Sequence, residues 1–143
     1  MASEALKNAQ AAQPRKVAVN PPECPPLFRP YYSESVRVTG TLLFIAGQVS
    51  FDKAGKVVHK GDMKGQTRQA LENLKTVLRA HNATLDNLVK MTVYTTRMDL
   101  FEDIAQVREE YFPKNGPTSA IVGVKELALP DLMVEFETIA VVD

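Results

Sequence analysis

Apolar residues recur every three or four positions in two segments of this chain, which is the spacing of one helix face. The first segment follows Asp62, a residue type that caps helices, and its periodicity predicts a helix that ends near Asn82. The second segment covers residues 99–112, where Ile104 and Val107 mark the apolar stripe. We therefore expect two amphipathic helices, each with one face in the core.

The other apolar runs predict strands, because they are rich in β-branched residues or alternate between apolar and polar positions. They cover residues 35–38, 42–50, a short stretch within 51–58, 88–98, 118–127 and 132–142. The first two runs flank Gly40, which predicts a hairpin. The second of them is apolar on both faces, so we expect it to be a central strand of its sheet.

The order of these elements, β-β-β-α-β-α-β-β, predicts an α+β fold with both helices on one face of the sheet. In the last strand Ile139 and Val141 alternate with Phe136 and Ala140, so that both faces of this strand are partly apolar. A small domain with such a second face commonly hides it in an oligomer. The pattern therefore favours self-association through the sheet.

Residues 1–28 are polar and alanine-rich, and they run into a proline-rich stretch that reads VNPPECPPLFRP. Proline lacks an N–H donor and restricts the residue before it, so we expect no helix or strand in this segment. We therefore divide the chain into a flexible proline-rich N-terminal arm at 1–28 and one folded domain at 29–143.

Charge and composition narrow the range of functions. The 143-residue chain has 17 lysines and arginines against 17 aspartates and glutamates, so it lacks a broad basic surface for nucleic acids or membranes. Its single cysteine, Cys24, excludes an intrachain disulfide and a multi-cysteine zinc site. No apolar run reaches the roughly 20 residues of a membrane span, and residues 1–16 lack the apolar core of a secretory signal. We expect a cytoplasmic protein without nucleic-acid or membrane partners.

Glu135 and Glu137 stand two residues apart in the last predicted strand, so they share one face at a separation of roughly 7 Å. Two like charges on a largely apolar strand require either a partner or a function. In one interpretation they pair with basic residues across an interface. In the other, burial and the neighbouring charge alter the pKa of one carboxyl, which then moves a proton in a cleft.

Arg108 projects within the apolar stripe of the second predicted helix, four residues after Ile104. A guanidinium stays charged even when it is buried, so it needs an acceptor. That acceptor is either a buried glutamate, such as Glu135 or Glu137, or backbone carbonyls. Alternatively, it is the carboxylate of a bound ligand.

The chain from about Tyr31 onward resembles the Rid (reactive intermediate deaminase) family, also called the YjgF family. The resemblance rests on the order and spacing of YSESVRV, LLFIAGQVSFDKAGKVV, GDMKGQTRQALENLK, LDNLVKMTVYTTRMDLFEDI, EEYF and VEFETIAV. It implies a chorismate-mutase-like α+β fold and a homotrimer whose sheets surround a central barrel, with three clefts between neighbours. Family members of the deaminase type hydrolyse 2-imino acids or their enamine tautomers to ammonia and a 2-keto acid, without a metal or organic cofactor.

The resemblance also implies roles for individual residues. Tyr32 matches the cleft tyrosine of the family's YS motif, and Gly47 and Gln48 match its SGQ motif, whose backbone lines the cleft. Glu135 matches the first glutamate of the E-(I/V)-E motif, which is implicated in handling the attacking water. The resemblance therefore implies that Glu135 is a general acid/base and Glu137 its structural neighbour.

Four positions depart from the family pattern. Deaminases carry P-A-R-S with an arginine that clamps the substrate carboxylate, whereas this chain reads PTSAIV and has Ser119 at that position. Ala46 replaces the serine of SGQ, Ala105 replaces a cleft asparagine, and Ile121 replaces a frequent cysteine. Arg108 lies three residues beyond Ala105 on the same helix face, which makes it the candidate replacement for the missing clamp.

Two functions from different classes follow. The first is a divergent, cofactor-independent hydrolase or deaminase of a small imine, enamine or related C–N electrophile. Its catalytic residues are Glu135 and Tyr32, and its substrate-binding residues are Gly47, Gln48, Arg108, Ser119 and Ile121. The second is a non-catalytic homotrimer that binds a small molecule or a protein in its clefts, which the more apolar cleft positions favour.

Overall fold

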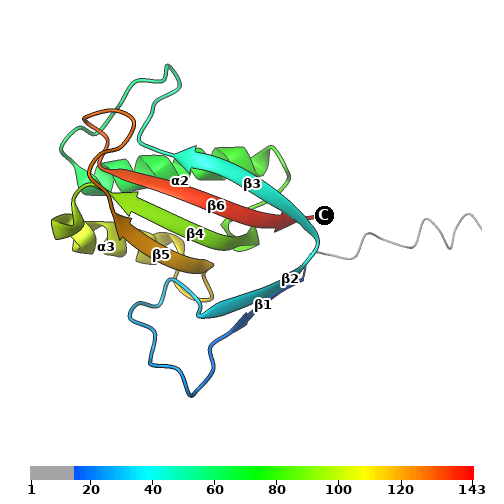
Figure 1. Ribbon diagram of the computed structural model, residues 1–143. Helices are drawn as coiled ribbons and strands as arrows, with labels where there is room; N and C mark the ends of the chain where they lie inside the picture. Colours follow the sequence, from blue (N-terminus) through cyan, green and yellow to red (C-terminus); the bar gives the residue numbers. More distant parts are fainter. Residues whose placement is uncertain (1–14) are drawn as a thin grey trace, which may run out of the picture.

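The computed structural model describes residues 15–143, and its main body consists of two layers (Figure 1). One layer contains the helices α2 (Met63–Arg79) and α3 (Phe101–Tyr111), and both lie on a single face of the other layer, a four-stranded sheet. The strand order is β3 (Thr41–Gln48), β6 (Val134–Val142), β4 (Leu88–Thr95) and β5 (Thr118–Gly123). The β4–β5 pair is parallel, and the other two pairs are antiparallel. The predicted α+β fold with both helices on one face is confirmed.

The helix α2 begins and ends where the sequence predicts. The side chain of Asp62 accepts a hydrogen bond from the backbone N–H of Gly65 at 2.9 Å, which satisfies one of the free donors at the helix start. The helix ends at Arg79, and Asn82 just beyond it takes a left-handed conformation with φ 54°. No helix within residues 15–143 is both long and apolar enough to cross a membrane.

The helix α3 follows a short 3-10 turn, η2 (Met98–Leu100), and packs beside α2. Ile104, Ala105 and Val107 on its inner face have no exposed surface. Arg108 lies on the same face and is only 1% exposed. The prediction that an arginine occupies the apolar stripe is therefore confirmed.

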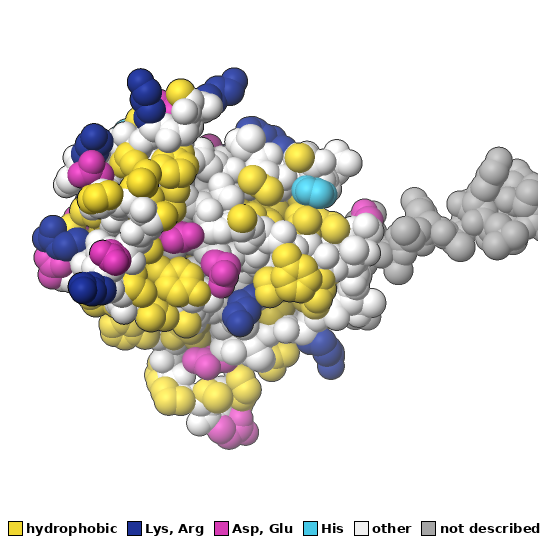
Figure 2. All heavy atoms as spheres, turned by 45° about the horizontal axis from the view of Figure 1, so that its top comes forward, with side chains coloured by type: hydrophobic (Ala, Val, Ile, Leu, Met, Phe, Trp, Pro, Cys, Tyr) yellow, Lys and Arg dark blue, Asp and Glu magenta, His cyan; other side chains and the backbone are white. Residues whose placement is uncertain are grey.

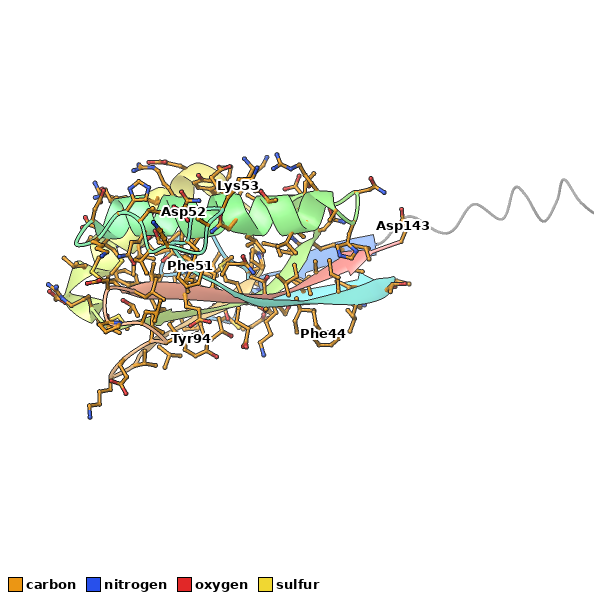
Figure 3. All side chains as sticks on the ribbon, turned by 90° about the horizontal axis from the view of Figure 1, so that it is seen from above. Phe44, Phe51, Asp52, Lys53, Tyr94 and Asp143 are labelled. Atoms are coloured by element: carbon orange, nitrogen blue, oxygen red, sulfur yellow. The ribbon has the colours of Figure 1, made fainter. Side chains whose placement is uncertain are left out.

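The sheet has a covered face and an open face. In β6, Phe136 is completely buried beneath the helices, while Glu135 and Glu137 on either side of it point the opposite way. Phe44 and Tyr94 project from the face that the helices leave uncovered (Figure 3). Phe44 is 73% exposed, so a single chain leaves apolar surface on this side of the sheet. We call this side the open face.

The N-terminal strands form a separate two-stranded ribbon. The strands β1 (Arg15–Val19) and β2 (Ser35–Thr39) pair only with each other. The main body also contains a second 3-10 turn, η1 (Leu85–Asn87), directly before β4. The prediction that residues 1–28 contain no strand was wrong for residues 15–19, which form β1 before the proline run that begins at Pro21. Residues 20–28 contain no helix or strand, as predicted, and residues 1–14 lie outside the described residues.

The predicted hairpin between residues 35–38 and 42–50 was also wrong. The chain turns at Gly40, whose φ of 143° suits glycine, and β2 pairs with β1 instead of β3. β3 is consequently an edge strand of the main sheet and not a central one, and its outward apolar residues stay exposed on the open face. The strand predicted within 51–58 is reduced to a single bridge between Phe51 and Val57.

Candidate functional site

A small cavity beside α3 and β5 brings together four of the predicted site residues, Tyr32, Arg108, Ser119 and Ile121. Its volume is about 160 Å³, and its lining consists of Phe28, Tyr31, Tyr32, Phe101, Arg108, Ser119 and Ile121. We call it the Arg108 cavity. Its three other aromatic walls, Phe28, Tyr31 and Phe101, were not predicted from the sequence. Two signals were available: Tyr31 precedes the predicted cleft tyrosine, and Phe101 extends the apolar stripe of α3.

The Arg108 guanidinium makes several contacts, but none of them is to a carboxylate. Its Nη2 donates a hydrogen bond to Oγ of Ser119 at 2.8 Å and contacts Sδ of Met91 at 3.4 Å. Its central carbon lies 4.0 Å from the centre of the Tyr31 ring. Within residues 15–143 no ion pair reaches Arg108, and its buried Nε has no hydrogen-bond partner. Within a single chain, Arg108 does not pair with a glutamate of β6; a pair between copies stays a prediction.

The Arg108 side chain nevertheless remains charged at neutral pH. Burial lowers its pKa to about 10, and the neighbouring Tyr31 opposes this change. Burial also raises the pKa of the Tyr31 hydroxyl, which keeps this ring neutral. The charge of Arg108 is therefore stabilised by a serine hydroxyl, a thioether and the face of an aromatic ring.

Two acidic residues of α3 are engaged by another arginine, which lies beside two aromatic walls of the cavity. Arg29 forms ion pairs with Glu102 and with Glu109, the latter at 3.5 Å. The same guanidinium lies 5.3 Å from the centre of the Phe28 ring and 5.5 Å from that of Phe101. Arg29 thus neutralises the nearby carboxylates and holds two aromatic walls of the Arg108 cavity.

Tyr32 contributes a hydroxyl group at the wall of the cavity. This hydroxyl accepts a hydrogen bond from the backbone N–H of Phe28 at 3.1 Å. Because the hydroxyl is the acceptor in that bond, its own proton can be donated to a ligand. Tyr32 is therefore suited to orient a negatively charged or electron-rich group.

The other predicted site residues lie where β3 meets β6. The Glu135 carboxyl packs so closely over Gly47 that a Cβ at position 47 would collide with Oε1. Burial raises the pKa of this carboxyl, and the negative charge of Glu137 raises it further. Glu137 itself accepts a hydrogen bond from the Tyr94 hydroxyl at 3.3 Å. Glu135 thus has one property of a candidate base, a pKa shifted toward neutrality, and its carboxyl lies directly against the backbone of Gly47.

Within a single chain, the side chain of Gln48 is engaged locally. Its side-chain amide donates a hydrogen bond to the carbonyl oxygen of Ala46 at 3.0 Å, two residues away in the same strand. The family resemblance implied a role for the backbone at this position, and the local side-chain bond leaves that role open.

The two groups of site residues lie on opposite faces of the sheet. Glu135 pairs with Tyr94 in the register of β6 and β4, and Tyr94 projects from the open face (Figure 3). Ser119 pairs with Met91, which is completely buried under the helices, and Arg108 reaches Ser119 from α3. One small ligand cannot touch both Glu135 and Arg108 of the same chain.

Comparison with known proteins identifies the family. A model of the family described as Endoribonuclease L-PSP matches residues 26–142. A RutC family protein of Pyrococcus horikoshii is 43% identical over 110 residues, which are 76% of this chain and 85% of that protein. The crystal structure of YyfB from Yersinia pestis, of the conserved Rid protein family, has a TM-score of 0.82 at 33% identity. That match covers 89% of this chain and 98% of the other. The chain belongs to the Rid/YjgF family.

A third relative extends the family link. A Mycobacterium tuberculosis protein of the YjgF/YER057c/UK114 family has a TM-score of 0.63 at 27% identity, over 90% of this chain and all of that one. The resemblance stated from the sequence is thus confirmed, together with the chorismate-mutase-like α+β fold. The substituted cleft positions lie apart in this Rid/YjgF member: Ala105 is completely buried, whereas Ala46 is exposed in β3.

A hollow on the open face of this Rid/YjgF member has a volume of about 390 Å³. Its lining consists of Phe44, Ile45, Ala46, Lys90, Thr92, Glu137, Thr138 and Ile139. Figure 2, in which the open face is turned partly downward, shows apolar side chains gathered between charged ones. The surface is therefore mixed, with apolar residues at its centre.

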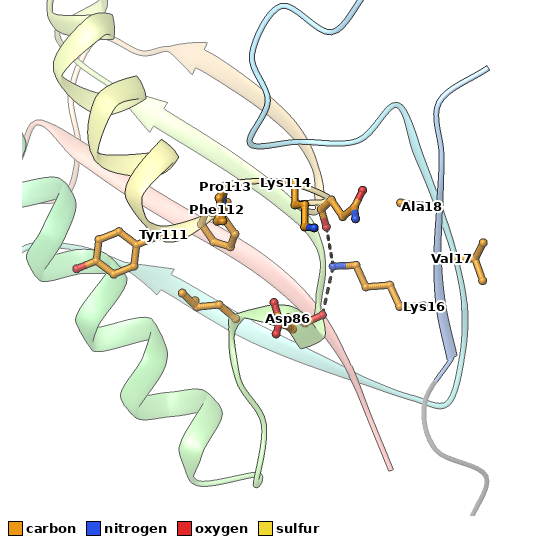
Figure 4. A pocket seen from close by; sticks show the side chains of 11 residues that line it. Lys16, Val17, Ala18, Asp86, Tyr111, Phe112, Pro113 and Lys114 are labelled. Atoms are coloured by element: carbon orange, nitrogen blue, oxygen red, sulfur yellow. Dashed lines mark hydrogen bonds between the residues drawn. The ribbon is translucent and has the colours of Figure 1, made fainter. Parts of the chain in front are cut away.

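The sequence analysis also missed a groove between β1 and the end of α3, with a volume of about 610 Å³ (Figure 4). The Lys16 amine donates hydrogen bonds to the carbonyl oxygens of Asp86 at 3.2 Å and Asn115 at 3.4 Å. Burial lowers the pKa of this amine, and the charge of Asp86 opposes the change. This groove was not predicted because its β1 wall lies within residues 1–28, which the sequence pattern assigned to an arm without helix or strand.

Proposed function

We propose that this Rid/YjgF family member is a cofactor-independent hydrolase that deaminates a small imine, enamine or related C–N electrophile in the cytoplasm. The observation that carries the proposal is the Glu135 carboxyl, which is held over Gly47 and has a raised pKa. A general base works best when its pKa approaches the working pH, so this shift favours proton transfer from water.

The reaction requires only water and one base. As the water oxygen bonds to the carbon of a protonated imine, the Glu135 carboxylate takes a proton from that water and a neutral carbinolamine forms. Glu135 then returns the proton to nitrogen, the C–N bond breaks, and ammonia leaves. The remaining hydroxyl loses its proton to solvent and becomes the carbonyl of the product. The Tyr32 hydroxyl donates a hydrogen bond that orients the substrate for this attack.

The position of the two groups of site residues supports a site shared between chains. Glu135 lies on the open face and the Arg108 cavity on the other side of the sheet, so a complete site needs Glu135 of one copy and the cavity of a neighbouring copy. The exposed side chains of Phe44, Leu42 and Val122 supply the apolar surface for such an association. We propose a homotrimer, in line with the family resemblance.

The second candidate is a non-catalytic homotrimer of the same fold that binds a small molecule or a protein in its clefts. The apolar lining of the Arg108 cavity, with Phe28, Phe101 and Ile121, favours it. The name of the family model suggests cleavage of RNA, but basic and acidic residues are equal in number. RNA binding depends on basic side chains that neutralise phosphates, so the balanced charge of this chain does not favour a nuclease.

Ammonia release distinguishes the two candidates. The protein is incubated with a panel of amino-acid-derived imines, and ammonia is measured against a protein-free control. Glu135→Gln should keep the fold and lower turnover by about 10²–10⁴-fold, the usual contribution of general acid–base catalysis. Glu137→Gln is the comparison variant: it removes a charge that raises the pKa of Glu135 but keeps the base, so its turnover should fall far less than that of Glu135→Gln. Equal turnover in both variants would return Glu135 to a structural role, and no acceleration of any imine would favour the binding module.

A further inference from the structure

Arg108 carries a positive charge into the protein interior that no acidic residue balances. It is 1% exposed, and within the described part of the chain it has no ion-pair partner. Both of its hydrogen-bond contacts use Nη2, while Nε is buried and has no partner. A buried charge in this state is strongly destabilising, so its presence calls for an explanation.

The empty space beside Arg108 supplies one. The Arg108 cavity has a volume of about 160 Å³. At roughly 30 Å³ of liquid volume for each water molecule, it has room for about five waters or for one small organic molecule. Tyr31 lies against the guanidinium, so a carboxylate in the cavity would have to meet Arg108 in the plane of its N–H groups, which is the geometry that carboxylates prefer.

The lining that a single chain gives the cavity contains no acidic residue. The two nearby carboxylates, Glu102 and Glu109, are engaged by Arg29. Ser119 already accepts a hydrogen bond from Arg108, so its hydroxyl proton can be donated to a ligand. The Tyr32 hydroxyl can likewise donate its proton to a ligand, since it accepts a hydrogen bond from the backbone N–H of Phe28.

We propose that the Arg108 cavity binds the carboxylate of a small organic anion, with Arg108 as the ion-pair partner and Ser119 and Tyr32 as hydrogen-bond donors. Arg108 reaches this place from α3, whereas the arginine clamp of family deaminases comes from the strand that here carries Ser119. The proposed anion site is inferred only from the contacts and the cavity within this chain. The further conclusion, that the bound anion is the substrate, rests on the proposed function and restricts the substrates to small carboxylates.

The test compares propionate with its neutral isostere propionamide, each titrated into the full-length protein and followed by NMR or calorimetry. The wild type should bind propionate at least about tenfold more tightly than propionamide, since a hydrogen-bonded ion pair is lost in the amide. Arg108→Met should weaken propionate binding by about ten- to a hundredfold and leave propionamide binding unchanged. Arg79→Met removes an equally charged but exposed side chain and should change neither affinity.

Thermal unfolding separates binding from structure. Methionine is an apolar side chain of similar length, so Arg108→Met should leave the unfolding midpoint unchanged or raise it if the arginine serves a ligand. If this variant fails to fold, Ser119→Ala decides, because it removes one ligand donor and keeps the charge. It should weaken propionate binding by about fivefold. Equal affinity of the wild type for both probes, or propionate binding within about threefold of wild type in the deciding variant, overturns the proposal.

The carboxylate site and the proposed hydrolysis fail separately. Loss of propionate binding in Arg108→Met, with no turnover of any imine by the wild type, would keep the anion site and remove the enzyme. Turnover that depends on Glu135 while Arg108→Met binds propionate like the wild type would keep the enzyme and remove the anion site.

Discussion

Substitution of Gly47 by alanine tests whether the position of the Glu135 carboxyl matters. The added Cβ would occupy the place of Oε1 of Glu135, and the side-chain carbons of Glu135 lie within contact distance as well. Because Gly47 does not have a positive φ, alanine suits its backbone, and the carboxyl has to move instead. A displacement of about 1 Å at a reacting group commonly costs about 10²-fold in rate.

Two assays follow the change, and one of them needs no substrate. Turnover of the active imine should fall by about 10²-fold in Gly47→Ala. The pKa of Glu135, measured by NMR titration, should fall toward its ordinary value of 4.5, because the displaced carboxyl is less buried. Global stability should be unchanged or rise by about 0.4–1 kcal/mol, since alanine restricts the unfolded chain.

Gly123→Ala is the matched control. Gly123 also lies in a strand without a positive φ, and an added Cβ there would meet only Cε of Met98 at 3.7 Å, an ordinary contact. This variant should keep both the turnover and the pKa of Glu135. If Gly47→Ala keeps turnover within threefold of wild type and an unshifted pKa, the carboxyl does not need the position described above, and the assignment of Glu135 as the base loses its structural support.

Three further predictions concern assembly, pH and the helix start. Light scattering at micromolar concentration should give roughly three times the chain mass of 15.8 kDa, and Phe44→Asp should reduce it to that of one chain; a monomeric wild type would contradict the shared site. Because the folded pKa of Glu135 lies above 4.5, its contribution to stability is fully present below that pH and is lost as pH rises through the folded pKa. Glu135→Gln should therefore unfold at a higher temperature than wild type at pH 8 and at the same temperature at pH 4, whereas an advantage that persists at pH 4 would exclude titration as its cause. Asp62→Ala removes the acceptor for the N–H of Gly65 and should lower the free energy of unfolding in urea by about 1 kcal/mol, in contrast to an exposed mid-helix control such as Arg68→Ala.

The helices were predictable because their signals are local. Asp62, the long apolar periodicity and the left-handed Asn82 lie within one continuous segment, and each supports the same boundaries. In the same way, the burial of Arg108 follows from the apolar periodicity of α3. The partner of Arg108 could not be predicted, because Ser119 and Tyr31 reach it from elements distant in sequence.

The strands were predicted less well because pairing is not a local property. The number of strands agrees only because a missed strand, β1, offsets the stretch within 51–58 that forms one bridge. The residues of β3 are apolar on both sides, which is typical of a central strand, but one of those sides belongs to the open face. An apolar open face has the same composition as a core, so the sequence pattern cannot separate the two.

The sequence predicted one cleft, whereas the structure divides the predicted residues between two faces of the sheet. Tyr32, Ser119 and Ile121 lie together with Arg108, but the register that puts Glu135 on the opposite face depends on the pairing of β4 with both β5 and β6. A shift of one residue in either pairing would move a whole strand to the other face. The alternation in β6 places Glu135 on the opposite face from Phe136, but the face that Ser119 shares depends on how β5 pairs with β4, and the local sequence does not fix that pairing.

The division of the site between two faces has a genetic consequence. If each cleft takes Glu135 from one copy and the Arg108 cavity from the next, two inactive chains can repair one another. In mixed trimers of Glu135→Gln and Arg108→Met chains, about one cleft in four would combine an intact base with an intact cavity. Two alleles that are each inactive alone would then complement each other in the same cell. A chain that carried both substitutions could never contribute to a working cleft, whichever partner it met.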